Sequence, residues 1–149
     1  MRLNGHDSGL LRRIATTKSA GGKYFVFEQL LIDFGHWSRH GVMPTIFYPS
    51  DVTRPSTPSK FKEPLDVFML IDHSLLKFKF DPQYQAEYLA FDLYFLTSGH
   101  ATEVRRKKSA KLKRLLNSYP CMFLRDYAQA HERMQNLVRN ELLLSLKMQ

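Results

Sequence analysis

The sequence predicts an all-α fold, a compact helical domain that ends in a long C-terminal helix. Apolar residues recur at three- and four-residue spacing through most of the chain, as they do on one face of an α-helix. The segment 46–48 has some extended character but is too short to predict a sheet. With 149 residues, 44% of them hydrophobic, the chain has enough length and apolar content to bury one core.

The domain organisation predicted from composition is a short arm followed by one domain. Residues 1–22 are polar and end in a Gly-Gly pair, so we expect a flexible basic arm there. Residues 23–149 are expected to form a single helical domain. A Pro-rich loop is expected at 42–64, because this stretch holds five of the seven prolines.

The first helix of the domain is predicted over residues 25–39. Gly35 interrupts its apolar pattern, at a cost of about 1 kcal/mol relative to alanine, which indicates close packing at that position. Gly41 is expected to end the helix. The apolar residues that set the spacing are Phe25, Leu30, Leu31, Phe34 and Trp37.

A second helix is predicted from Leu65 to Phe80. Asp72 falls on its apolar stripe and would need a partner if buried. The expected stripe consists of Leu65, Phe68, Met69, Leu75 and Leu76.

Asp81-Pro82 is typical of an N-cap followed by proline in the first helical position. The helix that follows is expected to end at Ser98-Gly99. Its aromatic stripe is expected to be core and not a base-stacking platform, and consists of Tyr84, Tyr88, Phe91 and Phe95.

Residues 105–114 are the most strongly charged segment of the chain. They contain seven Lys or Arg and no Asp or Glu, against a formal net charge of +8 for the whole protein. Such a cluster repels itself and favours a polyanionic partner, of which the nucleic-acid backbone is the most common. On a helix over 102–116, Arg105 and Lys108 would lie inside or beside the apolar stripe. The residues expected to contact phosphates are Arg105, Arg106, Lys107, Lys111, Lys113 and Arg114.

A helix-turn-helix is predicted over residues 102–135, because the basic segment is followed by a turn and by Pro120, which suits a helix start. The last helix is expected to run from there to the chain end. Arg125, Gln129 and Arg133 lie one turn apart on it and are expected to enter the DNA groove. Its expected apolar stripe consists of Phe123, Tyr127, Ala130, Met134, Leu137 and Leu144.

Several short patches resemble one family. Leu31–Arg39 looks like a Leu-x-x-Trp-Gly-x-Trp-x-Arg segment, with Phe34 in place of the first tryptophan. Arg125–Glu132 is similar to an Arg-Lys-x-Leu-Gln-x-Ala-Glu recognition helix, although Asp126 replaces its basic residue. The remaining matching positions are Ile71, Asp72, Leu75, Pro82, Tyr84, Tyr94, Phe95 and Gly99. In these patches the chain resembles the phage Q-type late-gene antitermination proteins, in the lambdoid branch with a sigma-region-4-like helix-turn-helix.

This resemblance implies a specific role. Proteins of that family bind double-stranded DNA overlapping a phage late promoter, load onto the host RNA polymerase and allow it to read through terminators. It implies a non-enzymatic transcription regulator in the cytoplasm of a bacterial host, without cofactor or metal, and places Arg125 and Gln129 at DNA-reading positions. The spacing from Ser118 to Arg125 is two residues longer than in the family pattern, which puts the turn geometry in doubt.

Three other classes of function remain open from the sequence. The basic segment would equally suit an RNA-binding accessory protein, and the long last helix a protein-only adaptor. A small basic nuclease could use His36, His40 or His100 as acid or base, and Asp33 shares a helical spacing with the first two. No nucleophile elbow, phosphate loop or HExxH pattern is present.

Two further expectations concern compartment and cysteine chemistry. The sequence shows no secretory signal and no membrane-spanning stretch, so a cytosolic protein without membrane contact is expected. The single cysteine, Cys121, excludes an intramolecular disulfide and is expected to pack or to face solvent. The oligomeric state is left open.

Overall fold

The computed structural model describes residues 2–19, 21–41, 48–49, 58–96 and 127–149. Within these ranges the regular structure is helical apart from one two-residue strand pair, which confirms the all-α fold with a long C-terminal helix. Of the predicted helix-turn-helix over 102–135, only the part from residue 127 lies among the described residues.

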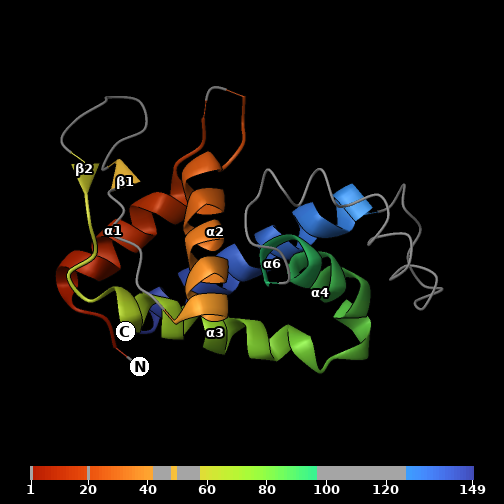
Figure 1. The fold of residues 1–149 in the computed structure, drawn as a ribbon. Coiled ribbons are helices and arrows are strands. Elements are labelled where there is room, and N and C mark those ends of the chain that lie inside the picture. The colour runs from red at the N-terminus through yellow and green to blue at the C-terminus, as the bar shows by residue number, and fades with distance from the viewer. Residues whose placement is uncertain (1, 20, 42–47, 50–57, 97–126) are drawn as a thin grey trace.

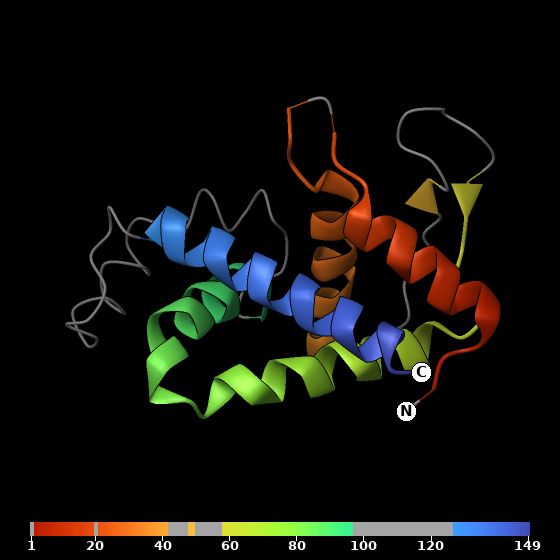
Figure 2. The ribbon, with the colours of Figure 1, turned by 180° about the vertical axis from the view of Figure 1, so that it is seen from behind.

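Most of the other helices pack around the last helix of the chain. Helix α6 crosses behind α2 in Figure 1 and in front of it in Figure 2, with α3 along one edge of the molecule and α4 beside α6. Helix α6 contacts α1, α3 and α4, and α2 packs against η2 and α1. The helical elements are α1 (Gly5–Thr16), α2 (Phe25–His40), α3 (Pro64–Lys79), the 3-10 turn η1 (Pro82–Tyr84), α4 (Gln85–Phe91), the π-helical turn η2 (Asp92–Leu96) and α6 (Tyr127–Lys147). The strands are β1 (Tyr48–Pro49) and β2 (Pro58–Ser59), paired antiparallel.

The expectation of a flexible arm over 1–22 is wrong, because α1 is an ordered part of the core. Asn4 caps this helix by accepting a hydrogen bond from the Asp7 backbone N–H at 2.8 Å. The segment is polar overall, but it contains a short amphipathic stripe that α6 and α2 cover. Its buried residues are Asp7, Leu10, Leu11, Ile14 and Ala15.

Helix α2 is present as predicted, with Leu30, Leu31 and Phe34 buried, but Phe25 of the predicted stripe is 57% exposed. Gly41 ends the helix with a left-handed backbone (φ 69°) and donates to the Trp37 carbonyl at 2.7 Å. Gly35 is the site of close packing: a Cβ atom there would collide with the backbone carbonyl of Phe95 in η2. The glycine therefore lets two helical backbones approach each other.

Helix α3 is present as predicted, but a different face is buried. Leu65, Met69 and Leu76 are 50%, 40% and 44% exposed, and Asp72 is exposed and needs no buried partner. The prediction combined residues from two sides of the helix: Phe68 and Leu75 are buried as predicted, whereas the other three face solvent. The buried residues are Val67, Phe68, Leu70, Ile71, Ser74, Leu75 and Phe78.

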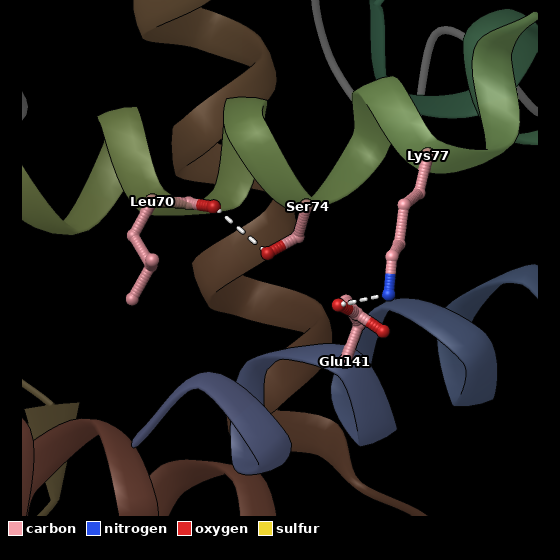
Figure 3. Close-up of polar contacts among 4 residues, drawn as sticks. All are labelled: Leu70, Ser74, Lys77 and Glu141. Atoms are coloured by element: carbon pink, nitrogen blue, oxygen red, sulfur yellow. Dashed lines mark hydrogen bonds and ion pairs between the residues drawn. The ribbon is translucent and has the colours of Figure 1, made fainter. Parts of the chain in front are cut away.

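Two polar contacts accompany the packing of α3 against α6 (Figure 3). The buried Ser74 hydroxyl donates to the Leu70 carbonyl one turn earlier at 2.9 Å, so no partner outside the helix is required. Lys77 Nζ lies 2.9 Å from Glu141 Oε1 on α6. Because the lysine side chain is 65% exposed, this ion pair orients the two helices more than it stabilises them.

The segment after α3 begins as predicted, with Asp81 Oδ1 accepting from the Gln83 backbone N–H at 3.0 Å. Of its aromatic residues Phe91 and Phe95 are buried and Tyr84 is half-buried, which confirms their role in the core. Burial raises the pKa of the half-buried Tyr88 phenol, and the carboxylates of Asp92 and Asp72 raise it further.

Helix α6 buries one stripe with regular four-residue spacing along its whole length. Of the predicted stripe, Ala130 and Met134 are buried and Leu137 is half-buried against the core, whereas Leu144 is 55% exposed; Phe123 and the Tyr127 side chain lie outside what the structure describes. The buried residues are Ala130, Met134, Val138, Leu142 and Leu146. Among the described residues, no helix is both long and apolar enough to cross a bilayer.

Candidate nucleic-acid interface

Most of the predicted phosphate and groove contacts fall outside the described residues. Gln129 and Arg133 are the two that the structure describes. Those outside it are Arg105, Arg106, Lys107, Lys111, Lys113, Arg114 and Arg125.

Gln129 and Arg133 both lie on the outer side of α6, near its start. Gln129 is exposed, and Arg133 lies one turn further along. Gln129 and Arg133 are both exposed and lie one turn apart, so they share one accessible side of the helix next to the buried Ala130 and Met134. This arrangement gives an amide and a guanidinium on one accessible helix face, which have the chemistry to bind base edges or phosphates.

The guanidinium of Arg133 is already paired within the protein. Its Nε lies 3.2 Å from Glu87 Oε1 of α4, and the arginine side chain is 53% exposed. Exposed pairs of this kind contribute about 0–1 kcal/mol, so binding to a polyanion could break it at little cost. As long as the pair persists, however, Arg133 adds little positive potential to the surface.

His131 anchors the beginning of α6 to η2, a contact that sequence reasoning missed. Its ring centroid lies 4.1 Å from that of Tyr94 and 5.3 Å from that of Phe95, and its Nε2 is 2.8 Å from the Gln135 side-chain nitrogen. The Tyr94 hydroxyl donates to Glu28 Oε1 of α2 at 3.1 Å. The cluster thus ties together three elements that no local spacing connects.

Both ends of the stretch that carries the basic segment emerge beside this cluster. Residue 96 is the last described residue of η2, and residue 127 is the first of α6. Phe95 lies one residue before the first of these ends, and His131 lies four residues after the second. The rings of the two residues are in contact. The described residues on either side of 97–126 therefore lie near each other, at the contact between η2 and the start of α6.

The Phe95 carbonyl accepts a hydrogen bond from Arg39 Nη1 of α2. A π-helical turn widens the backbone and displaces carbonyls from the regular α-helical hydrogen bonds, which explains why an arginine binds here. Burial lowers the pKa of Arg39. The contact fixes the end of η2 against α2.

A smaller cationic group lies at the α1–α6 contact. The Tyr24 ring has the Arg139 guanidinium 4.0 Å from its centroid and Lys18 Nζ at 5.4 Å. Arg139 Nη1 also donates to the Ala15 carbonyl at 3.3 Å, where the C-terminal end of α1 favours a cation. These contacts within the fold account for Arg139, so we assign this cationic group a structural role.

The histidines of α2 do not form a metal site with Asp33. His36 and His40 are exposed, with ring centroids 4.7 Å apart, whereas Asp33 is buried and accepts a hydrogen bond from Gln29 at 3.1 Å. No group of three or more potential metal ligands occurs in the part of the chain that the structure describes. His100 and Cys121 lie outside it.

No protein-family model, curated protein or solved structure matches this chain. The resemblance to Q-type antitermination proteins consequently stays a prediction from the sequence patches.

Proposed function

We propose that this protein binds double-stranded DNA through residues 105–114 together with the exposed start of α6, and that it acts as a transcription antitermination factor with a bacterial RNA polymerase. The observation that carries the DNA-binding proposal is the concentration of charge: ten residues hold seven Lys or Arg, while the formal net charge of the chain is +8. The antitermination role rests on the sequence resemblance and places the protein in the cytoplasm of a phage-infected bacterium.

The described surface is compatible with this proposal in two respects. Gln129 and Arg133 are accessible on the helix that follows the basic segment. The described residues that flank 97–126 also lie near each other, which is compatible with one ligand contacting both the basic segment and the start of α6. Phosphate contacts would then hold the backbone while Arg125 and Gln129 reach base edges.

Fluorescence anisotropy with a labelled DNA duplex, at stepped NaCl concentrations, tests the phosphate contacts. The double variant Lys111→Ala/Arg114→Ala is expected to lower the slope of log K against log salt by about 2, since each phosphate contact contributes about 0.9. The matched control Lys62→Ala/Lys79→Ala removes two exposed lysines near the ends of α3 and should leave the slope unchanged. Equal slopes for the two double variants would refute the assignment.

Base reading is tested separately, with a duplex selected from a random pool against a scrambled one. Arg125→Ala and Gln129→Ala should reduce the preference for the selected duplex by roughly 1–3 kcal/mol each, with little change in binding to the scrambled one. A loss of the same size on both duplexes would exclude these residues from base reading.

Competition and function assays decide between the remaining classes. A hairpin RNA of equal length that displaces the duplex at fixed salt would favour an RNA-binding protein, and Mg²⁺-dependent cleavage of either nucleic acid would favour a nuclease. For the antitermination role, purified polymerase should be retained by the protein on promoter DNA and should then read through a downstream terminator in vitro. Normal termination in the presence of bound protein would overturn that role and leave DNA binding intact.

A further inference from the structure

Helix α3 has a second apolar face, opposite the one that packs in the core. Four large side chains lie on it and are 40–77% exposed. Single exposed apolar residues are common on protein surfaces, but three on one side of a 16-residue helix and a fourth at its C-cap form a stripe that Asp72 interrupts at its middle. In chain order they are Leu65, Met69, Leu76 and Phe80.

We propose that this outer face of α3 pairs with the same face of a second copy of the chain, antiparallel and about a two-fold axis. The intervals between successive residues of the stripe are the same when they are counted from either end of the helix. An antiparallel pair centred between Asp72 and His73 therefore places Leu65 opposite the second copy's Phe80, and Met69 opposite its Leu76. A face that is self-complementary in this way satisfies the requirement of a two-fold interface.

Charge at the edge of the stripe selects the antiparallel direction. Asp66 and Lys77 are eleven residues apart and so lie on the same side of the helix. An antiparallel two-fold pair keeps this side of both helices at the same edge of the interface and brings Asp66 beside the second copy's Lys77, whereas a parallel two-fold pair places the two copies of this side at opposite edges and leaves these charges unpaired. Lys77 already binds Glu141 at 2.9 Å, but its exposed ammonium has further N–H groups for a second carboxylate.

The interface has one unfavourable position at its centre. Asp72 is exposed and lies next to the proposed two-fold axis, where the two carboxylates of a dimer would repel each other. The contact also involves one helix from each copy, about 22 Å long from Leu65 to Phe80, and is smaller than a typical stable interface of about 1,600 Å². The dimer is accordingly weak and depends on concentration.

Sedimentation velocity at protein concentrations from about 10 µM to about 1 mM tests the dimer, a range that brackets a weak association. It is done without nucleic acid, because the proposal does not depend on the proposed DNA binding. Leu76→Glu should raise the dimer dissociation constant at least tenfold. The control Leu144→Glu changes a comparably exposed leucine of α6 and should leave it unchanged. Asp72→Asn should lower it about threefold, because it removes the carboxylate repulsion.

Cysteine cross-linking in a Cys121→Ser background tests the register, since that background has no other cysteine. His73→Cys alone should form an interchain disulfide on oxidation, because residue 73 lies beside the axis. Met69→Cys alone should not, since two copies of residue 69 would be about 10 Å apart along the helices and a disulfide requires Cα atoms within about 7 Å. Met69→Cys combined with Leu76→Cys should cross-link.

The proposal would be overturned by a protein that stays monomeric over the whole concentration range. It would also be overturned by a Met69→Cys variant that cross-links while His73→Cys does not. Circular dichroism of each variant, compared with the native protein, separates loss of the dimer from loss of the fold. A Leu76→Glu protein that is folded and dimerises like the native one would equally refute it.

Discussion

At the scale of single residues, the Asp7 carboxylate of α1 caps the start of a different helix, α3. The side chain is fully buried. Its two oxygens accept hydrogen bonds from the backbone N–H groups of Lys62 and Glu63, both at 2.8 Å. Glu63 is the N-cap residue of α3, and its own side chain makes no capping bond. Asp7 therefore satisfies donors that helix α3 would otherwise leave unpaired.

Asp7→Ala should lower the free energy of unfolding by about 2–3 kcal/mol, because it leaves these two partly buried N–H groups without their acceptor. Urea denaturation followed by circular dichroism measures the effect. Asp72→Ala, which changes an exposed aspartate of α3, should stay within about 0.5 kcal/mol of the native protein. If the two variants were equally stable, the capping role of Asp7 would be wrong.

The contact between Gly35 and Phe95 gives a second residue-scale prediction. Alanine favours a helix over glycine by about 1 kcal/mol, yet Gly35→Ala should destabilise the protein, by about 2 kcal/mol. Its Cβ would meet the Phe95 carbonyl, with the carbonyl carbon only 2.9 Å away, and this is backbone that cannot rotate aside. Gly9→Ala in α1 is the matched control, since the nearest atom there is a flexible Arg13 nitrogen at 3.9 Å.

The two glycine variants should differ in sign in a thermal or urea melt. Gly9→Ala is expected to be neutral or stabilising by up to about 1 kcal/mol. A stabilised Gly35→Ala protein would mean that the backbones of α2 and η2 are far enough apart to accommodate a methyl group.

At the scale of elements, α6 is stabilised by a stripe that ends with Leu142 and Leu146, and not by Leu144. Leu142→Ala should cost about 2–5 kcal/mol because it leaves a cavity between α6 and its neighbours, whereas Leu144→Ala should cost well under 1 kcal/mol. Chemical denaturation of the two variants compares the same substitution at positions two residues apart. Similar losses would show that the buried face of α6 includes Leu144 and that the helix is rotated about its axis.

The existence of α2, α3 and the last helix could be predicted from apolar spacing, but the buried face could be predicted only in part. In α3 the apolar residues surround the helix almost entirely, with Leu65 and Met69 on one side and Leu70 and Ile71 on the other. Local spacing does not decide between two apolar faces, since the decision depends on which helix packs there. The same is true of α1, whose four apolar core residues are too few to stand out from a polar segment.

At the scale of the whole molecule, the charge of the candidate site could be predicted from the sequence, but the arrangement of its residues could not. The basic segment is visible in the composition of ten residues. The ring contact of His131 with Tyr94 and Phe95 joins residues some 36 positions apart in the chain, and nothing in their local spacing indicates it. Likewise, the pairing of Arg133 with Glu87 could not be foreseen, although it reduces the charge available at the start of α6.

The uneven distribution of charge predicts how the stability of the protein depends on salt. Seven like charges within ten residues repel one another most when the Debye length is long, about 30 Å at 0.01 M salt against about 8 Å at 0.15 M. The ion pairs Lys77–Glu141 and Arg133–Glu87 respond in the opposite sense, but both are exposed and individually weak. Repulsion should therefore dominate, and the free energy of unfolding should rise by about 0.5–1 kcal/mol between these two salt concentrations.

A variant in which all seven basic residues of 105–114 are replaced by glutamine isolates this effect. It should be at least as stable as the native protein at 0.01 M NaCl, and its stability should change less with added salt, because the repulsion is absent. Urea midpoints for both proteins at each salt concentration make the comparison. A variant more than about 1 kcal/mol less stable than the native protein at low salt would mean that these side chains contribute to the folded state, and their assignment to an external polyanion would then have to be abandoned.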